Sequence, residues 1–146
     1  MNDFYEHISQ KFRTYFEQYE QIDFVLIFGS IISNKFSELS DIDVAIHFKE
    51  LVDLLLIGKI VSDLENISGR KIDVIELNDL YKKNPLLAYN IISKSKIINM
   101  NNFEKYTAFK RSTFLYYLDT EMMRTEFKKS FSKRIEQKMF GKRNYA

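Results

Sequence analysis

Three aspartates lie in short apolar segments whose alternation is typical of β-strands. Asp41 and Asp43 stand two residues apart in DIDVAIHF, and Asp73 stands in KIDVIEL. Residues two apart on a strand point to the same face, so Asp41 and Asp43 share a face, and a neighbouring strand could add Asp73. Clustered carboxylates repel one another unless a cation neutralises them, and oxygen ligands suit Mg²⁺ together with waters and substrate phosphates. The three aspartates therefore predict metal-assisted phosphoryl or nucleotidyl transfer.

A Gly-Ser pair precedes these acids along the chain. Gly29-Ser30 ends the apolar run FVLIF, and ten residues separate the pair from Asp41. Glycine lets the backbone approach a phosphate closely, and a helix that begins there offers free N–H groups to an anion. Ser30 adds a hydroxyl donor. Each motif alone is common, and the combination of a strand, Gly-Ser, Asp-x-Asp and a third aspartate is more specific.

Hydrophobic periodicity divides the first half of the chain into alternating helices and strands. We expect a helix over 3–20, a strand over 24–28, a short helical turn and loop over 30–39, a strand over 41–48, a helix over 51–67 and a strand over 71–77. Asp79 and Glu76 are expected to begin a loop. These elements would place the Gly-Ser pair and the three aspartates on a small sheet.

The second half reads as mostly helical. Pro85 opens a helix over 86–94, and a short extended piece follows at 97–98. Asn101 and Glu104 fit a capping box for a long helix over 101–140. An unbroken helix of that length would reach about 60 Å, so we expect either a break near 119–125 or an interface.

The order of elements predicts an α/β fold, a small mixed β-sheet with helices packed on one side plus a helical C-terminal extension. We expect residues 1–100 to form the core. Residues 101–146 would be an extension and not an independent domain.

Composition excludes several functional classes. The chain has 146 residues, of which 45% are apolar and 29% charged, as in a single globular domain. It has no cysteine and only two histidines, His7 and His47, which excludes disulfides, thiolate chemistry and a histidine-built zinc site. His47 shares a strand face with Asp43, so it could contact substrate or simply be a half-exposed sheet residue. Without a membrane-length apolar run or a signal sequence, we expect a cytoplasmic protein that does not contact membranes.

Basic side chains gather at the C-terminal end. Residues 124–146 hold eight basic and two acidic side chains, although the whole chain carries only +2. This is the pattern of a solvated helix end favoured by the helix dipole, or of a docking face for an acidic partner or a polyanion. No RNA-binding module is visible, so direct nucleic-acid binding is not expected.

The motif GS-x10-DID resembles the nucleotidyltransferase signature of the polymerase-beta-like superfamily, and Asp73 stands where that family has its third carboxylate. The small size, and the segment from Pro85 to FEKYTAFKRSTFLYYLDTEMMR, are most similar to the minimal nucleotidyltransferase (MNT) antitoxins of HEPN–MNT toxin–antitoxin pairs. The resemblance implies that Asp41, Asp43 and Asp73 are catalytic and hold Mg²⁺, and that Gly29 and Ser30 contact nucleotide phosphates. It also implies that AMP moves from ATP to a tyrosine of a partner HEPN ribonuclease, which is thereby silenced.

One position departs from the family pattern. Many members carry Ala-Arg-Gly shortly after Gly-Ser, whereas this chain has Ile32, Ser33 and Asn34, and its nearest cation is Lys35. Lys35 is therefore a further candidate for nucleotide binding, although lysine cannot reproduce a bidentate arginine contact. Two alternatives stay open: a non-catalytic antitoxin that neutralises its partner by binding alone, and a small-molecule nucleotidyltransferase. A nucleic-acid-extending enzyme is disfavoured by the absence of a basic stripe outside the tail.

Overall fold

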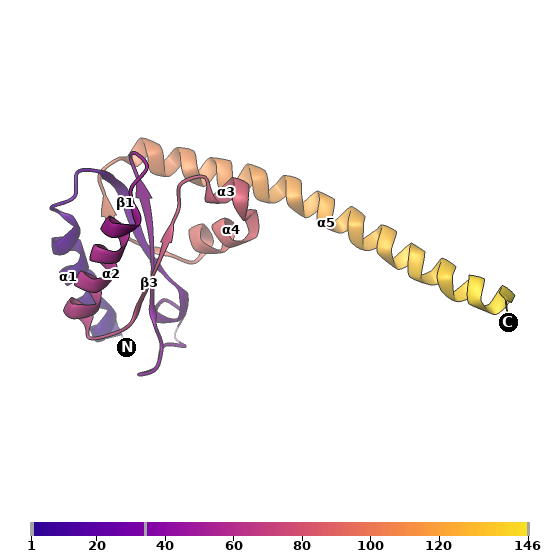
Figure 1. Cartoon of the computed structure of the whole chain (residues 1–146), viewed down its shortest axis with the longest axis horizontal. Coiled ribbons are helices and arrows are strands. Elements are labelled where there is room, and N and C mark those ends of the chain that lie inside the picture. The colour runs from indigo at the N-terminus through magenta and orange to yellow at the C-terminus, as the bar shows by residue number, and fades with distance from the viewer. Residues whose placement is uncertain (1, 34, 146) are drawn as a thin grey trace.

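A four-stranded mixed sheet forms the centre of the molecule in a computed structural model (Figure 1). The structure describes residues 2–33 and 35–145, with side-chain placement for all of these except Asn2, Arg124 and residues 136–145. The elements are α1 (Asn2–Phe16), β1 (Ile22–Phe28), the 3-10 turn η1 (Gly29–Ile31), β2 (Ile42–Phe48), α2 (Leu54–Ser68), β3 (Ile72–Glu76), α3 (Leu80–Lys83), α4 (Pro85–Ser93), β4 (Lys96–Met100) and α5 (Phe103–Tyr145). The strand order is β3-β2-β1-β4, with β2 and β3 parallel and the other two pairs antiparallel.

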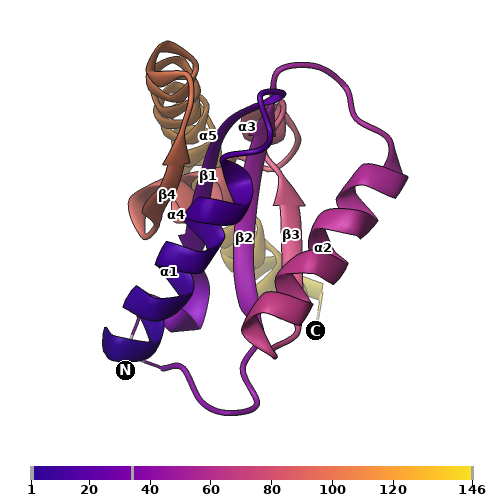
Figure 2. The ribbon, with the colours of Figure 1, turned by 90° about the vertical axis from the view of Figure 1, so that its left-hand side faces the viewer.

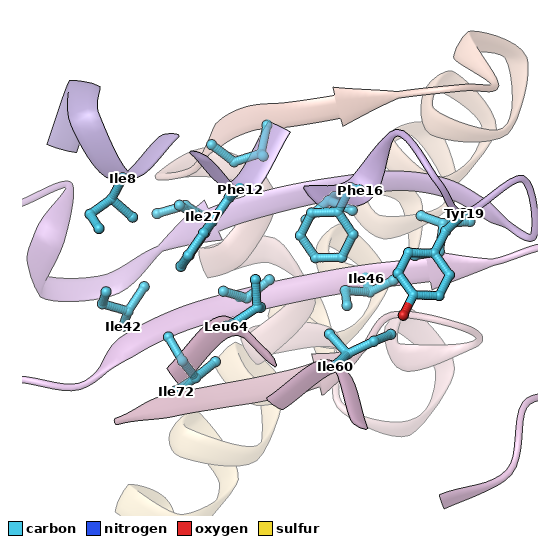
Figure 3. Close-up of a cluster of buried hydrophobic side chains, with 14 of the residues drawn as sticks. Ile8, Phe12, Phe16, Tyr19, Ile27, Ile42, Ile46, Ile60, Leu64 and Ile72 are labelled. Carbon is cyan, nitrogen blue, oxygen red and sulfur yellow. The ribbon is translucent and has the colours of Figure 1, made fainter. Parts of the chain in front are cut away.

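Helices α1 and α2 cover one face of the sheet (Figure 2). Phe12 and Phe16 of α1 and Ile60 and Leu64 of α2 are fully buried there against strand residues such as Ile46 (Figure 3). The helical spacing of the α1 side chains and the alternation along β2 both present apolar groups to this layer. This layer is the larger of the two cores.

The opposite face of the sheet is covered as well. Phe24, Leu26 and Ala45 point to that side and pack with Ile91 of α4 and Phe109 of α5. The mixed sheet and the helical C-terminal extension agree with the prediction, and α3, α4 and the start of α5 add a second helical layer to the one expected. The central strands are apolar on both faces over these positions, and burying both faces requires helices on both sides.

Local signals account for most element boundaries. Asp53 caps α2 by accepting a hydrogen bond from the Leu56 amide at 3.0 Å, and left-handed Gly69 ends the helix. Helix α1 ends at Phe16, earlier than the predicted 3–20, because the chain turns so that Tyr19 enters the core. The short helix α3 replaces the loop expected after Asp79.

Helix α5 is continuous over 43 residues, so of the two alternatives expected, a break near 119–125 or an interface, the break is wrong. No proline or glycine stands between positions 103 and 140, and the hydroxyls of Thr120 and Thr125 donate to carbonyls of the preceding turn without interrupting the helix. Its first turn is capped by Asn102, which accepts from the Lys105 amide at 3.1 Å, and not by Asn101. The Asn101 side chain instead donates to the carbonyl oxygens of Tyr19 and Ile22.

The second half of α5 projects away from the sheet (Figure 1). Leu118, Met122, Phe127 and Phe131 are all more than half exposed along it. Over the described part of the chain, no helix combines the length and apolarity that crossing a bilayer requires.

Candidate functional site

Strand pairing brings two of the three predicted aspartates together. In the parallel register of β2 and β3, Asp43 stands beside Asp73. In the antiparallel register of β1 and β2, Asp43 also stands opposite Phe28, the residue before Gly29. Asp41 lies one residue before β2 begins. The end of β1 and the starts of β2 and β3 therefore meet at one edge of the sheet.

Gly29 lies directly against the Asp43 carboxylate. Its φ of +84° is in the left-handed region that favours glycine, and a Cβ built there would overlap the Asp43 carboxylate oxygen. The Gly29 carbonyl accepts hydrogen bonds from the amides of Ile32 and Ser33, which fixes the tight turn after β1. Only glycine fits between this turn and the carboxylate without a shift of one of them.

The electrostatics of the site follow from three acids in close range. Burial raises the pKa of Asp43, and the charges of Asp73 and Asp41 raise it further. Within the described residues the ion pairs are His47–Asp23 and Lys59–Asp63, so no side-chain cation there neutralises these acids. The arrangement favours a bound cation or a proton at Asp43.

The donor set suits a hard cation. Across residues 2–33 and 35–145, no three carboxylate, histidine or cysteine side chains form a ready-made metal cage. Mg²⁺ needs no such cage, since it commonly takes one or two carboxylates and completes its shell with waters and substrate phosphates. The paired Asp43 and Asp73, with the charge of Asp41 nearby, fit that requirement in ligand chemistry.

A cleft of about 750 Å³ opens beside the Gly-Ser turn. Gly29, Ser30 and Lys35 line one side of the cleft. Asn90 of α4 and Lys94, the residue that follows α4, line the other side. Its wall also includes Phe28 and other apolar side chains. The three aspartates do not line this cleft, and Asp43 adjoins it through its contact with Gly29. The polar donors and two lysines of the cleft can hold an anionic ligand, and the volume is that of an ordinary small-molecule site.

Sequence reasoning missed two cleft residues, Asn90 and Lys94, and left the role of His47 open. Asn90 and Lys94 carry no local motif, and only the packing of α4 beside η1 brings them to the cleft. His47, which shares the face of Asp43, lies elsewhere: it stacks on Phe24 at 5.0 Å between ring centres and bonds to Asp23 at 2.9 Å. With its side chain 15% exposed, it lines a separate cavity of about 270 Å³.

The sequence profile described as "Polymerase beta, Nucleotidyltransferase" matches residues 10–104. This range contains β1 to β4 and every candidate site residue. A protein of Methanocaldococcus jannaschii named "Putative protein adenylyltransferase MJ0435" is 35% identical over 69 residues, 47% of this chain and 71% of that protein. A second protein of that organism with the same kind of name, MJ1215, is 31% identical over 75 residues, 51% of this chain and 87% of that protein.

The chain belongs to the polymerase beta nucleotidyltransferase family.

Solved structures of toxin–antitoxin complexes share the fold of this nucleotidyltransferase. A chain of a toxin–antitoxin crystal structure with AMP-PNP has a TM-score of 0.70 at 15% identity, covering 85% of this chain and 98% of that chain. The MntA-HepT toxin–antitoxin structure gives 0.64 at 14%, covering 86% and 97%. A structure described as tri-AMPylated Shewanella oneidensis HEPN toxin in complex with MNT antitoxin gives 0.64 at 13%, covering 88% and 98%. The likeness extends beyond the matched family range into α5, since the coverage exceeds it.

Proposed function

We propose that this nucleotidyltransferase is an antitoxin that transfers AMP from ATP to a tyrosine hydroxyl of a partner HEPN ribonuclease and thereby silences it. The observation that supports this most directly is the Asp43 carboxylate, which lies beside Asp73 and against Gly29, a residue that lines the cleft. The adenylyltransferase names of the relatives and the AMP-PNP and AMPylated-toxin descriptions of the structural neighbours support the choice of nucleotide and acceptor. An ATP donor favours the cytoplasm as the place of action.

Asp41, Asp43 and Asp73 are the residues we assign to Mg²⁺. Bound Mg²⁺ would neutralise the triphosphate and stabilise the charge that develops as the phosphorus–oxygen bond breaks. The Gly29 backbone and the Ser30 hydroxyl would hold the β- and γ-phosphates, with Lys35 and Lys94 adding positive charge across the cleft.

The transfer itself balances on groups that the chain can position. The tyrosine oxygen forms a bond to the α-phosphorus, the bond from that phosphorus to the bridging oxygen breaks, and pyrophosphate leaves. The exposed Asp73 carboxylate accepts the tyrosine proton, which requires only hydrogen-bond reach. Holding the two reactants in line supplies the rest of the acceleration.

The exposed side of α5 is the surface we assign to the partner. Its apolar side chains beyond Leu118 lie next to Lys128, Lys129, Lys133 and Arg134, so an acidic helical surface would complement it. In this reading the core binds nucleotide, and the extension over 101–146 delivers the acceptor.

Mass spectrometry of the partner tests the proposal. A HEPN-type protein encoded beside this chain, incubated with it, Mg²⁺ and ATP, should gain the mass of one or more AMP groups on tyrosine. The double variant Asp41→Asn/Asp43→Asn should abolish the gain and keep the fold. Asp3→Asn/Glu20→Gln, which removes the same charge at exposed positions, is the matched control and should label normally. Labelling at the wild-type rate by the Asp41→Asn/Asp43→Asn variant contradicts the site assignment.

A non-catalytic antitoxin is the second candidate, because the family's arginine is replaced and Lys35 is the nearest cation. Such a protein would neutralise the toxin by binding alone. The same double variant separates the two candidates: neutralisation in cells that survives Asp41→Asn/Asp43→Asn favours binding, and neutralisation that is lost favours transfer. If the partner gains no mass and forms no complex with this chain, the acceptor is expected to be a small molecule.

A further inference from the structure

Arg70 lies between α2 and β3, and its side chain contacts residues 35–41, the segment that leads into Asp41. It follows Gly69, the C-cap of α2, and stands two residues before β3 begins at Ile72 and three before Asp73. One guanidinium nitrogen donates to two consecutive carbonyl oxygens, those of Ser37 at 2.9 Å and Glu38 at 2.7 Å. Two charge-assisted hydrogen bonds to adjacent peptide groups fix the direction of the backbone as well as its position.

Two aromatic rings hold the same guanidinium in place. Its central carbon lies 5.2 Å from the ring centre of Phe4 in α1 and 4.8 Å from that of Phe36 in the segment between η1 and β2. The two rings stack on each other at 5.3 Å. A planar cation against aromatic faces gains cation–π attraction, so ring contacts hold the arginine in addition to its hydrogen bonds.

The contacts of Arg70 hold the segment that contains two candidate site residues, Lys35 and Asp41. Lys35 of the cleft comes directly before Phe36, and Asp41 comes three residues after Glu38. Just beyond Asp41, the Ile42 amide donates to the Lys71 carbonyl at 2.9 Å. Asp41 is thus bracketed by hydrogen bonds to residues 70 and 71.

Apolar packing contributes little to this segment outside Phe36. Leu39 is 94% exposed, and Ser37 and Ser40 bond mainly to each other within the turn. A surface segment of this kind opens locally at low free energy unless specific contacts hold it.

We propose that Arg70 is a positioning residue of the nucleotide site, whose guanidinium, held against Phe4 and Phe36, orders residues 35–41 so that Asp41 and Lys35 face bound Mg²⁺–nucleotide. The inference rests on the proposed function for its ligand. Arg70 itself does not touch the substrate. Lysine would keep the charge and lose both the planar fork and the stacking, so charge alone cannot replace it.

The test uses the full chain with Arg70→Lys and two readouts that need no partner. Hydrogen–deuterium exchange of the peptide covering 35–41 should speed up by about tenfold or more, while peptides of β1 and α4 stay unchanged. Calorimetric affinity for the non-hydrolysable analogue AMP-PNP with Mg²⁺ should weaken by about five- to tenfold, because the ordering cost is now paid on binding. Phe36→Leu, which removes the stacking and keeps an apolar side chain, should shift both readouts in the same direction by less.

Arg13→Lys is the matched control. Arg13 also donates to a backbone carbonyl, that of Ile98 at 3.2 Å, but it joins α1 to β4. It should leave exchange over 35–41 and AMP-PNP affinity unchanged.

Unchanged exchange in Arg70→Lys overturns the proposal, as does faster exchange with wild-type affinity. A wild-type chain that binds AMP-PNP but labels no partner contradicts the proposed function alone, and the Arg70 comparison still stands on its two readouts. A wild-type chain that binds no nucleotide overturns both.

Discussion

At the scale of single residues, the site depends on how closely the backbone of Gly29 approaches Asp43. Gly29→Ala places a Cβ onto the Asp43 carboxylate and strains a φ of +84°. We expect the free energy of unfolding to fall by about 1–2 kcal/mol and adenylyl transfer to fall by about tenfold or more, since small displacements of catalytic groups are costly. Gly69→Ala is the control, because it has a similar φ of +68° with no atom near its Cβ position. It should lose stability through its φ alone and keep its activity, and equal activity losses in both variants would contradict a local role for Gly29.

We expect His47 to make the stability of the protein depend on pH. Burial lowers the pKa of His47 below its ordinary value of about 6.5, despite the neighbouring Asp23. The unfolded chain then binds more protons than the folded chain between the two pKa values, so stability falls as pH drops through that window. Chemical denaturation at pH 7.5 and 5.5 should show a larger loss for the wild type than for His47→Gln. The same pH dependence in both proteins would mean that His47 titrates alike in the folded and unfolded states.

At the scale of elements, α2 offers a change that should affect stability and not the site. Gly58 lies inside this helix, and nothing is within 4 Å of the position that a Cβ would occupy. Gly58→Ala should therefore raise the free energy of unfolding by about 0.5–1 kcal/mol through helix propensity. Denaturant titration measures it, and nucleotide affinity should not change. A loss of stability would show that α2 packs more tightly at this position than the structure has it.

The strands and the candidate site could be predicted from sequence because their signals are local. The alternation around Asp43 and Asp73 placed both on strands, and Gly29-Ser30 followed β1, the strand that pairs with the strand of Asp43. Contacts between segments that are distant in sequence produce no such local signal in the sequence. The hydrogen bonds from Arg70 to the segment before Asp41, and the position of Lys94 in the cleft, both depend on which elements pack together. Hydrophobic periodicity alone does not specify that packing.

Helix α5 shows the limit of length arguments. The expected break assumed that a small domain could not support so long a helix, whereas α5 packs on the sheet through residues such as Phe109 and Thr113 and then continues alone. No helix-breaking residue interrupts it between 103 and 140, so its sequence is locally consistent with its length. The interface that the sequence offered as the alternative to a break remains a prediction.

At the scale of the whole molecule, the proposed function assigns partner binding to the projecting half of α5 and nucleotide chemistry to the sheet. The packing of α5 on the rest of the fold extends to Tyr117, which stacks on Tyr89 at 3.7 Å between ring centres. Among the described side chains from Leu118 to Ile135, most are exposed. Removing residues 121–146 should therefore lower the melting temperature by only a few degrees, since little buried apolar area is lost. Affinity for AMP-PNP should match that of the full chain. The complex with the HEPN-type partner, measured by size-exclusion chromatography with light scattering, should be lost.

A full-length variant checks that the loss comes from the surface and not from truncation. Phe127 and Phe131 stack at 6.2 Å on the exposed side of α5, 68% and 54% exposed. Phe127→Glu/Phe131→Glu removes this apolar pair, adds negative charge opposite an acidic partner, and should weaken the complex at least as much as removing the helix end. Ser130→Glu, which adds charge on the same helix without removing an aromatic ring, should weaken it less. A complex that forms normally with both the truncated chain and the double variant would place the partner on the sheet core, where the acceptor tyrosine would then reach Asp73 without α5.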